Sequence, residues 1–104
     1  MDDITRLVEH LGAGDGSSDE EALALLAIHG RRAVEPLLSA AADAAAPRRA
    51  AVVTALGRIG DQRARRTILL ALADGSALVR AAAATASSAY PSQEPLGRLR
   101  TLLK

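Results

Sequence analysis

The side chains that could do chemistry in this 104-residue chain are mostly arginines. A catalytic site needs groups that exchange protons or ligate a metal, and the chain offers few of them. His10 and His29 fall on separate predicted helices, neither belongs to a metal-ligand spacing, and there is no cysteine. We interpret His29 as a half-buried residue at a helix end. We therefore expect no catalytic residue, no metal site and no cofactor, and we predict that the protein is not an enzyme.

Three consecutive acids form the other candidate cluster. Asp19, Glu20 and Glu21 resemble a set of paired carboxylates, but they follow Ser18 at the start of a predicted helix. Acids in a first helical turn interact favourably with the helix dipole, and Ser18 with Glu21 fits a capping box. We interpret these residues as helix caps.

The elements that must carry these residues follow a repeat of about 31 residues. The segment 49–55 aligns with 80–86, and the stretch 32–43 aligns with 63–74. A period of this length, with apolar residues at helical spacing, indicates stacked pairs of helices. Tyr90 is the only aromatic residue, which fits thin layers of alanine-rich helices better than a globular core.

Apolar spacing, caps and helix breakers predict seven helices. The expected ranges are 2–12, 19–29, 33–43, 48–59, 62–73, 77–89 and 93–103. Pro47 opens the fourth helix, Asp61 caps the fifth and Ser76 caps the sixth. Pro91 separates the last two helices.

These helices predict one all-α domain over residues 1–104, a right-handed α-solenoid of helical hairpins. A capping helix at 1–12 precedes repeats at 18–46, 47–76 and 77–104.

One sequence pattern recurs in these repeats. The second repeat carries Arg49-Ala50-Ala51, Ala55-Leu56-Gly57, Ile59-Gly60-Asp61, Ala64, Ile68-Leu69, Ala71-Leu72 and Asp74, and residues 78–86 repeat its opening. These residues resemble the HEAT repeats of the phycobilisome-lyase type. The resemblance covers about residues 18–104 and implies a helical solenoid, in which Arg49 and Arg80 match an arginine that defines the fold. It says little about activity, because that family ranges from pigment lyases and hydroxylases to scaffolds.

The third repeat departs from the pattern at two core positions. Ser87 and Arg100 replace leucines that the earlier repeats carry at the equivalent positions. A terminal repeat needs polar residues on its uncovered face. We therefore predict that 77–104 is a C-terminal cap of a complete solenoid, in which Ser87 and Arg100 are not both fully buried.

The second helices of such stacks line one face, which is our predicted binding surface. Around helix 62–73, Arg65, Ile68, Leu69 and Leu72 are expected inward, and Arg63, Arg66, Thr67 and Leu70 outward. An arginine beside an exposed leucine is typical of protein-binding patches, although a plain solvated face is the alternative. The predicted partner-binding residues are Arg32, Glu35, Arg63, Arg65, Arg66, Leu70, Arg98 and Thr101.

Arg65 has two interpretations. It either extends along its aliphatic stem to solvent, or it joins Arg63 and Arg66 in an anion-recognising patch. The whole face is on the order of 500–600 Å², below the roughly 800 Å² per partner of a standard interface. It suits a single helix or a short peptide.

The predicted function is accordingly a non-catalytic protein–protein interaction module, an adaptor or an accessory subunit. The alternative is binding of nucleic acid or another polyanion by arginines of the second and third repeats: Arg48, Arg49, Arg58, Arg63, Arg65, Arg66, Arg80, Arg98 and Arg100. Tyr90 is the only residue on which a base could stack, which disfavours single strands. An enzyme or lyase subunit is a third possibility that rests on the family likeness alone.

Charge is divided unevenly along the chain. Residues 1–46 carry nine acids and three bases, whereas residues 47–104 carry ten bases and three acids. A linear stack would therefore have an acidic and a basic end, and we expect either a monomer or weak head-to-tail self-association. The chain has no signal-peptide pattern and no apolar run of about 20 residues, so we expect a cytoplasmic protein without membrane contact.

Overall fold

The computed structural model describes residues 3–11, 16–42 and 45–90. Six α-helices lie within these residues: α1 (Asp3–His10), α2 (Gly16–His29), α3 (Arg31–Ala40), α4 (Ala46–Ile59), α5 (Arg65–Ala71) and α6 (Ala77–Ala86). A turn of 3-10 helix, η1 (Gln62–Ala64), precedes α5, and another, η2 (Ser87–Ala89), follows α6. The described ranges contain no strand, which confirms the predicted all-α class for this part of the chain.

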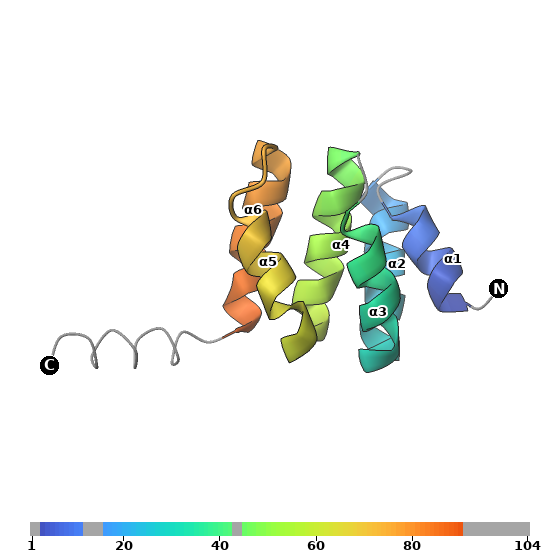
Figure 1. Cartoon of the computed structure of the whole chain (residues 1–104). Coiled ribbons are helices and arrows are strands. Elements are labelled where there is room, and N and C mark those ends of the chain that lie inside the picture. The colour runs from blue at the N-terminus through green and yellow to red at the C-terminus, as the bar shows by residue number, and fades with distance from the viewer. Residues whose placement is uncertain (1–2, 12–15, 43–44, 91–104) are drawn as a thin grey trace, which may run out of the picture.

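The helices form two layers (Figure 1). Helices α2, α4 and α6 follow one another in one layer, and α3 and α5 lie in front of them in the other. Helix α4 is the centre of the packing, because it contacts α2, α3, α5 and α6, while α1 packs against α2 and α3. Order along the chain is therefore order in space, as the repeat predicted.

The core is a row of aliphatic side chains between the two layers. Leu26, Leu37, Leu56, Ile68 and Val79 come from five different helices, and each is at most 1% exposed. Burying an aliphatic side chain of this size stabilises a fold by about 1.5–3 kcal/mol, so this row holds the layers together. Within the described residues, no polar or charged side chain is buried with them.

Helices α4 and α6 approach each other most closely at a glycine. A Cβ atom placed on Gly57 would lie 2.5 Å from the Cβ of Ala86 and 2.7 Å from its Cα. These are distances that real Cβ atoms do not show, so only glycine fits opposite Ala86 at this separation. The close contact shows how helices poor in large side chains still pack tightly.

The residues predicted to begin or end helices do so in the structure. Gly60 ends α4 in the left-handed conformation, with φ of 72°. The Oδ1 atom of Asp61 accepts a hydrogen bond from the Arg63 N–H at 2.8 Å, and Pro47 lies in the first turn of α4. Ser76 caps α6 through its hydroxyl oxygen. These assignments are confirmed.

The predicted capping box of the second helix is wrong. Helix α2 begins at Gly16, so Ser18 lies within the helix rather than before it. Glu20 also has another role, because its Oε2 atom lies 2.9 Å from Nη1 of Arg58 in α4. That ion pair links the first helices of two successive repeats.

Other boundaries differ by a few residues. Helix α3 spans Arg31–Ala40 rather than 33–43, the predicted helix 62–73 is divided into η1 and α5, and the predicted helix 77–89 ends as α6 followed by η2. The predicted helix 93–103 lies outside the described residues.

The prediction that 77–104 is a C-terminal cap is not decided by the two polar residues. Ser87 is half-buried, and its hydroxyl donates to the carbonyl of Ala84. Arg100 lies outside the described residues, so the cap hypothesis stays a prediction.

Candidate protein-binding face

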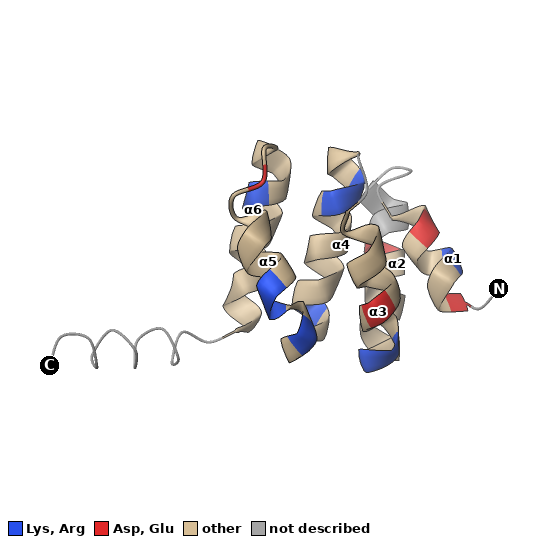
Figure 2. Cartoon of the chain, viewed as in Figure 1, with Lys and Arg blue, Asp and Glu red and all other residues tan. Residues whose placement is uncertain are grey.

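The second-helix face, formed by α3, η1 and α5, carries most of the predicted partner-binding residues. Five of them are exposed on it: Arg32, Glu35, Arg63, Arg66 and Leu70. Arg65 is half-buried, and Arg98 and Thr101 lie outside the described residues. Figure 2 shows that positive segments gather where α3 and α5 begin, whereas the later parts of both helices are uncharged.

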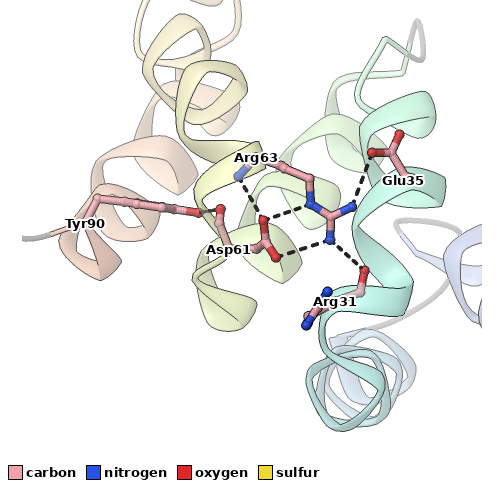
Figure 3. A network of polar contacts seen from close by, with 5 residues as sticks. All are labelled: Arg31, Glu35, Asp61, Arg63 and Tyr90. Carbon is pink, nitrogen blue, oxygen red and sulfur yellow. Dashed lines mark hydrogen bonds and ion pairs between the residues drawn. The ribbon is translucent and has the colours of Figure 1, made fainter.

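Arg63 joins the first two repeats on this face (Figure 3). Its Nε and Nη2 atoms donate to the two carboxylate oxygens of Asp61 at 3.0 and 3.2 Å. The same guanidinium reaches across to α3, where Nη2 donates to the carbonyl oxygen of Arg31 at 3.1 Å and Nη1 donates to Oε2 of Glu35 at 3.4 Å. One side chain thus bridges the turn of the second repeat to the second helix of the first.

This bridge stabilises the charged forms of Asp61 and Arg63. The hydrogen bonds from the side chain and backbone of Arg63 hold the pKa of Asp61 below its usual value. The carboxylate in turn raises the pKa of Arg63. Arg63 and Glu35 thus contact each other, whereas Arg32 and Arg66 form no ion pair among the described residues. No local sequence pattern indicates this bridge, since Arg63 and Glu35 are 28 residues apart.

A second joint uses the equivalent backbone atom. The Tyr90 hydroxyl donates to the carbonyl oxygen of Asp61 at 2.7 Å, and burial raises the pKa of that phenol, so it stays a donor. Arg31 and Asp61 each follow a turn glycine with positive φ, Gly30 at 60° and Gly60 at 72°. In both turns the residue after the glycine accepts a hydrogen bond from the following repeat.

A groove of about 300 Å³ lies between α3 and α5. Leu38 of α3 and Leu70 of α5 contribute to its walls, and Val53 and Val79, which are almost fully buried, line it from α4 and α6. Arg49 and Asp74 also line it. The groove is therefore mainly apolar, with one ion pair in its lining.

The ion pair in this groove is bidentate. Nε of Arg49 donates to Oδ2 of Asp74 at 3.0 Å, and Nη2 donates to Oδ1 at 2.9 Å. This contact is the main reason that the pKa of Asp74 is lowered. Arg80 donates to the backbone carbonyl of Asp74 at 2.8 Å. The interpretation of Arg49 and Arg80 as structural residues is confirmed.

Leu70 also borders a second hollow. This hollow, of about 450 Å³, is lined by Gln62, Arg65, Arg66, Leu69 and Leu70. Leu70 is 65% exposed and separates the two hollows, so an apolar side chain of a partner could contact it from either side. The prediction that Arg66 and Leu70 are exposed on this face is confirmed.

The prediction that Leu69 and Leu72 point inward is wrong. They are 44% and 41% exposed, whereas Ala64, Ile68 and Ala71 form the buried line. Both leucines lie on α5 or directly after it, where each residue advances by about 100°. The error is therefore in the arc that was chosen: the arc centred on Ile68 and the small Ala71 faces the core, and the arc that contains Leu69 and Leu72 does not.

Comparison with known protein families shows which family these helical repeats come from. The model of the HEAT-repeat family matches residues 34–104, which is more than half of the chain. The chain belongs to the HEAT-repeat family. No curated protein matches it. The match does not distinguish the phycobilisome-lyase type from other HEAT repeats, so that finer likeness stays a prediction. HEAT repeats are commonly protein-interaction modules and are generally non-catalytic.

In this HEAT-repeat chain, most arginines considered for polyanion binding have partners within the protein. Arg48, Arg49, Arg58, Arg63 and Arg80 each donate to an oxygen of another residue. Arg98 and Arg100 lie outside the described residues. Binding to a phosphate backbone needs clustered cations whose N–H groups are available. The internal hydrogen bonds of these five arginines therefore leave fewer N–H groups for a phosphate backbone.

The two histidines lie on separate helices, as predicted, at the ends of α1 and α2. His10 and His29 line one hollow of about 210 Å³ between α1 and α2, together with Asp3 and Arg6. His29 is half-buried at the end of α2, as predicted. No group of three or more potential metal-ligating side chains occurs among the described residues. Of the helices in this part of the chain, none has the length and apolar character to cross a membrane.

Proposed function

We propose that this HEAT-repeat chain is a non-catalytic adaptor or accessory subunit that binds a peptide or helix of a partner protein. The proposed binding site is the second-helix face. The observation that carries this proposal is the apolar groove between α3 and α5, with the exposed Leu70 on its rim.

The residues around the groove are of the types that dominate protein interfaces. Leu70 is 65% exposed, and a partner that covered it would gain part of the roughly 1.5–3 kcal/mol available from burying a leucine. Arg66 borders the neighbouring hollow, and arginine is enriched among residues that contribute most to binding. The groove is small, which favours a segment over a large globular surface.

The test is a double substitution on this face. Arg66→Glu with Leu70→Asp should abolish capture of the partner, because it reverses one charge and places a carboxylate at the apolar rim. Both side chains are exposed, so the circular dichroism spectrum and the melting temperature should not change. Capture is measured by affinity purification from the native host followed by mass spectrometry.

A matched control alters another surface in the same way. Arg6→Glu with Ile28→Asp also changes one exposed arginine and one exposed aliphatic residue, and Ile28 is 78% exposed on α2. This control should retain capture. If the Arg66 and Leu70 variant captures the same partner as the unaltered chain, the proposed binding face is wrong.

A further inference from the structure

The second-helix face has a positive end and an apolar end. Helices α3 and α5 run in the same direction, so both begin at the same edge of the stack, the lower edge in Figure 1. Arg31 and Arg32 open α3, and Arg65 and Arg66 open α5. Figure 2 shows positive segments at the start of α3, in the turn before α5 and at the start of α5, all toward that edge.

The positive end keeps an excess of positive charge among the described residues, with five arginines (Arg31, Arg32, Arg63, Arg65 and Arg66) and two acids (Glu35 and Asp61). Arg31, Arg32 and Arg66 are exposed, and the side chain of none of them forms an ion pair with a residue in the described ranges. Glu35 and Asp61, two acids on this face, are both bonded to Arg63. The charge of Arg31 also helps to lower the pKa of Asp61, although the two side chains form no ion pair. A partner that brought carboxylates to this end would therefore meet unpaired cations.

The apolar groove lies farther along the same helices. With a rise of about 1.5 Å per residue, Arg32 is about 9 Å along α3 from Leu38. Arg66 is about 6 Å along α5 from Leu70. Both leucines line the groove, so cations and apolar walls are separated by one to two helical turns.

We propose that the occupant is an acidic amphipathic segment of a partner protein. Its carboxylates lie over Arg31, Arg32 and Arg66, and its large aliphatic side chains, one to two helical turns away, enter the groove between Leu38 and Leu70. This inference rests on the proposed function and adds the chemistry and the direction of the bound segment. Charge complementarity of this kind selects partners and orients them more than it adds affinity.

The experiment is an unbiased peptide selection. A library of random peptides displayed on phage is selected on the full chain, and each recovered peptide is tested for binding to the R66E/L70D and R6E/I28D variants. Peptides that bind the unaltered chain and R6E/I28D, but not R66E/L70D, are classed as face-dependent. We expect face-dependent peptides to be enriched in Asp and Glu placed one to two helical turns from Leu, Ile or Phe.

A second measurement isolates the charges. A face-dependent peptide is labelled with fluorescein and compared with its Glu→Gln and Asp→Asn version by fluorescence polarisation. Removing the acids should weaken binding about two- to tenfold at low salt, and added salt should weaken the acidic peptide more than the amide version. Lysine at the acidic positions should restore binding to an Arg66→Glu chain.

The outcomes separate the two proposals. Face-dependent peptides that are neutral or basic overturn the acidic partner and leave the binding face intact. A selection that yields no face-dependent peptide counts against both proposals. A mass that rises with concentration in light scattering for the unaltered chain, but not for R66E/L70D, makes a second copy the occupant and also overturns the inference.

Discussion

The carboxylate of Asp74 accepts three hydrogen bonds, two from the guanidinium of Arg49 and one from the N–H of Ser76. It thereby connects helix α4 to the turn that begins α6. Both members of the ion pair are about four-fifths covered, with 21% and 18% of their side chains exposed. A pair of charge-assisted hydrogen bonds in this setting is stronger than an ordinary surface contact.

Replacing Asp74 should change the response of the protein to acid. The pKa of this carboxyl is lowered from its ordinary value of 3.8, so the pair stabilises the fold above that pH and loses this effect as the pH falls through the lower folded-state pKa. Asp74→Asn should therefore melt at a lower temperature at pH 7 and lose less stability on acidification below about pH 4. Melting followed by circular dichroism from pH 7 to pH 2.5 measures both effects.

The control for this prediction is Glu21→Gln, at an exposed position on α2. It should follow the unaltered chain at every pH. If Asp74→Asn keeps the melting temperature of the unaltered chain at pH 7, the ion pair does not stabilise the fold.

At the scale of helices, the contact between α4 and α6 depends on one missing side chain. Gly57→Ala would place a methyl group 2.5 Å from the Cβ of Ala86, so the two helices must separate or bend. We expect a loss of about 1–3 kcal/mol in the free energy of unfolding. Helix propensity alone would give the opposite sign, because alanine is favoured over glycine in a helix by roughly 1 kcal/mol.

Chemical denaturation measures this change, and Gly75→Ala is the matched control. A Cβ on Gly75 meets nothing within 4 Å, so the same substitution there should have little effect. If Gly57→Ala raises the free energy of unfolding, the close approach of α4 and α6 does not exclude a larger residue at position 57.

The helices themselves could be predicted from the sequence, because the repeat and the apolar spacing are local patterns. The face that each helix turns to the core could not, since α5 buries the small Ala71 beside Ile68 and leaves the larger Leu69 exposed. The exposed Arg66 and Leu70 were found from helical spacing. The groove and the Arg49–Asp74 pair were not, because they join residues 25 or more positions apart and depend on how the layers meet.

At the scale of the whole molecule, the described helices form a linear stack in which most contacts join adjacent elements. Helix α4 lies at the centre, and α1 contacts α2 and α3 at one end. In such an arrangement an end can open without disturbing the middle. Arg48 of α4 restrains this end, because its Nη1 atom donates to the carbonyl oxygens of Glu9 and Leu11 at 2.9 and 3.1 Å.

Arg48→Ala should release α1 locally. Loss of these two hydrogen bonds should speed amide exchange in α1 by about five- to thirtyfold, while exchange in α4 and α6 stays unchanged. Hydrogen exchange followed by mass spectrometry resolves the helices separately. Equal acceleration in all helices would mean that the stack unfolds as one cooperative unit.

The two joints between repeats have a consequence for how such a chain can evolve. In each joint one acceptor is the main-chain carbonyl of the residue after the turn glycine, which is present whatever side chain that residue carries. The accepting position is an arginine in one turn and an aspartate in the next, residues of opposite charge. The donor, by contrast, must be long and polar, and it is Arg63 in one joint and Tyr90 in the other. Duplicated repeats can therefore diverge at the accepting position without loosening the joint, whereas the donating position tolerates few replacements.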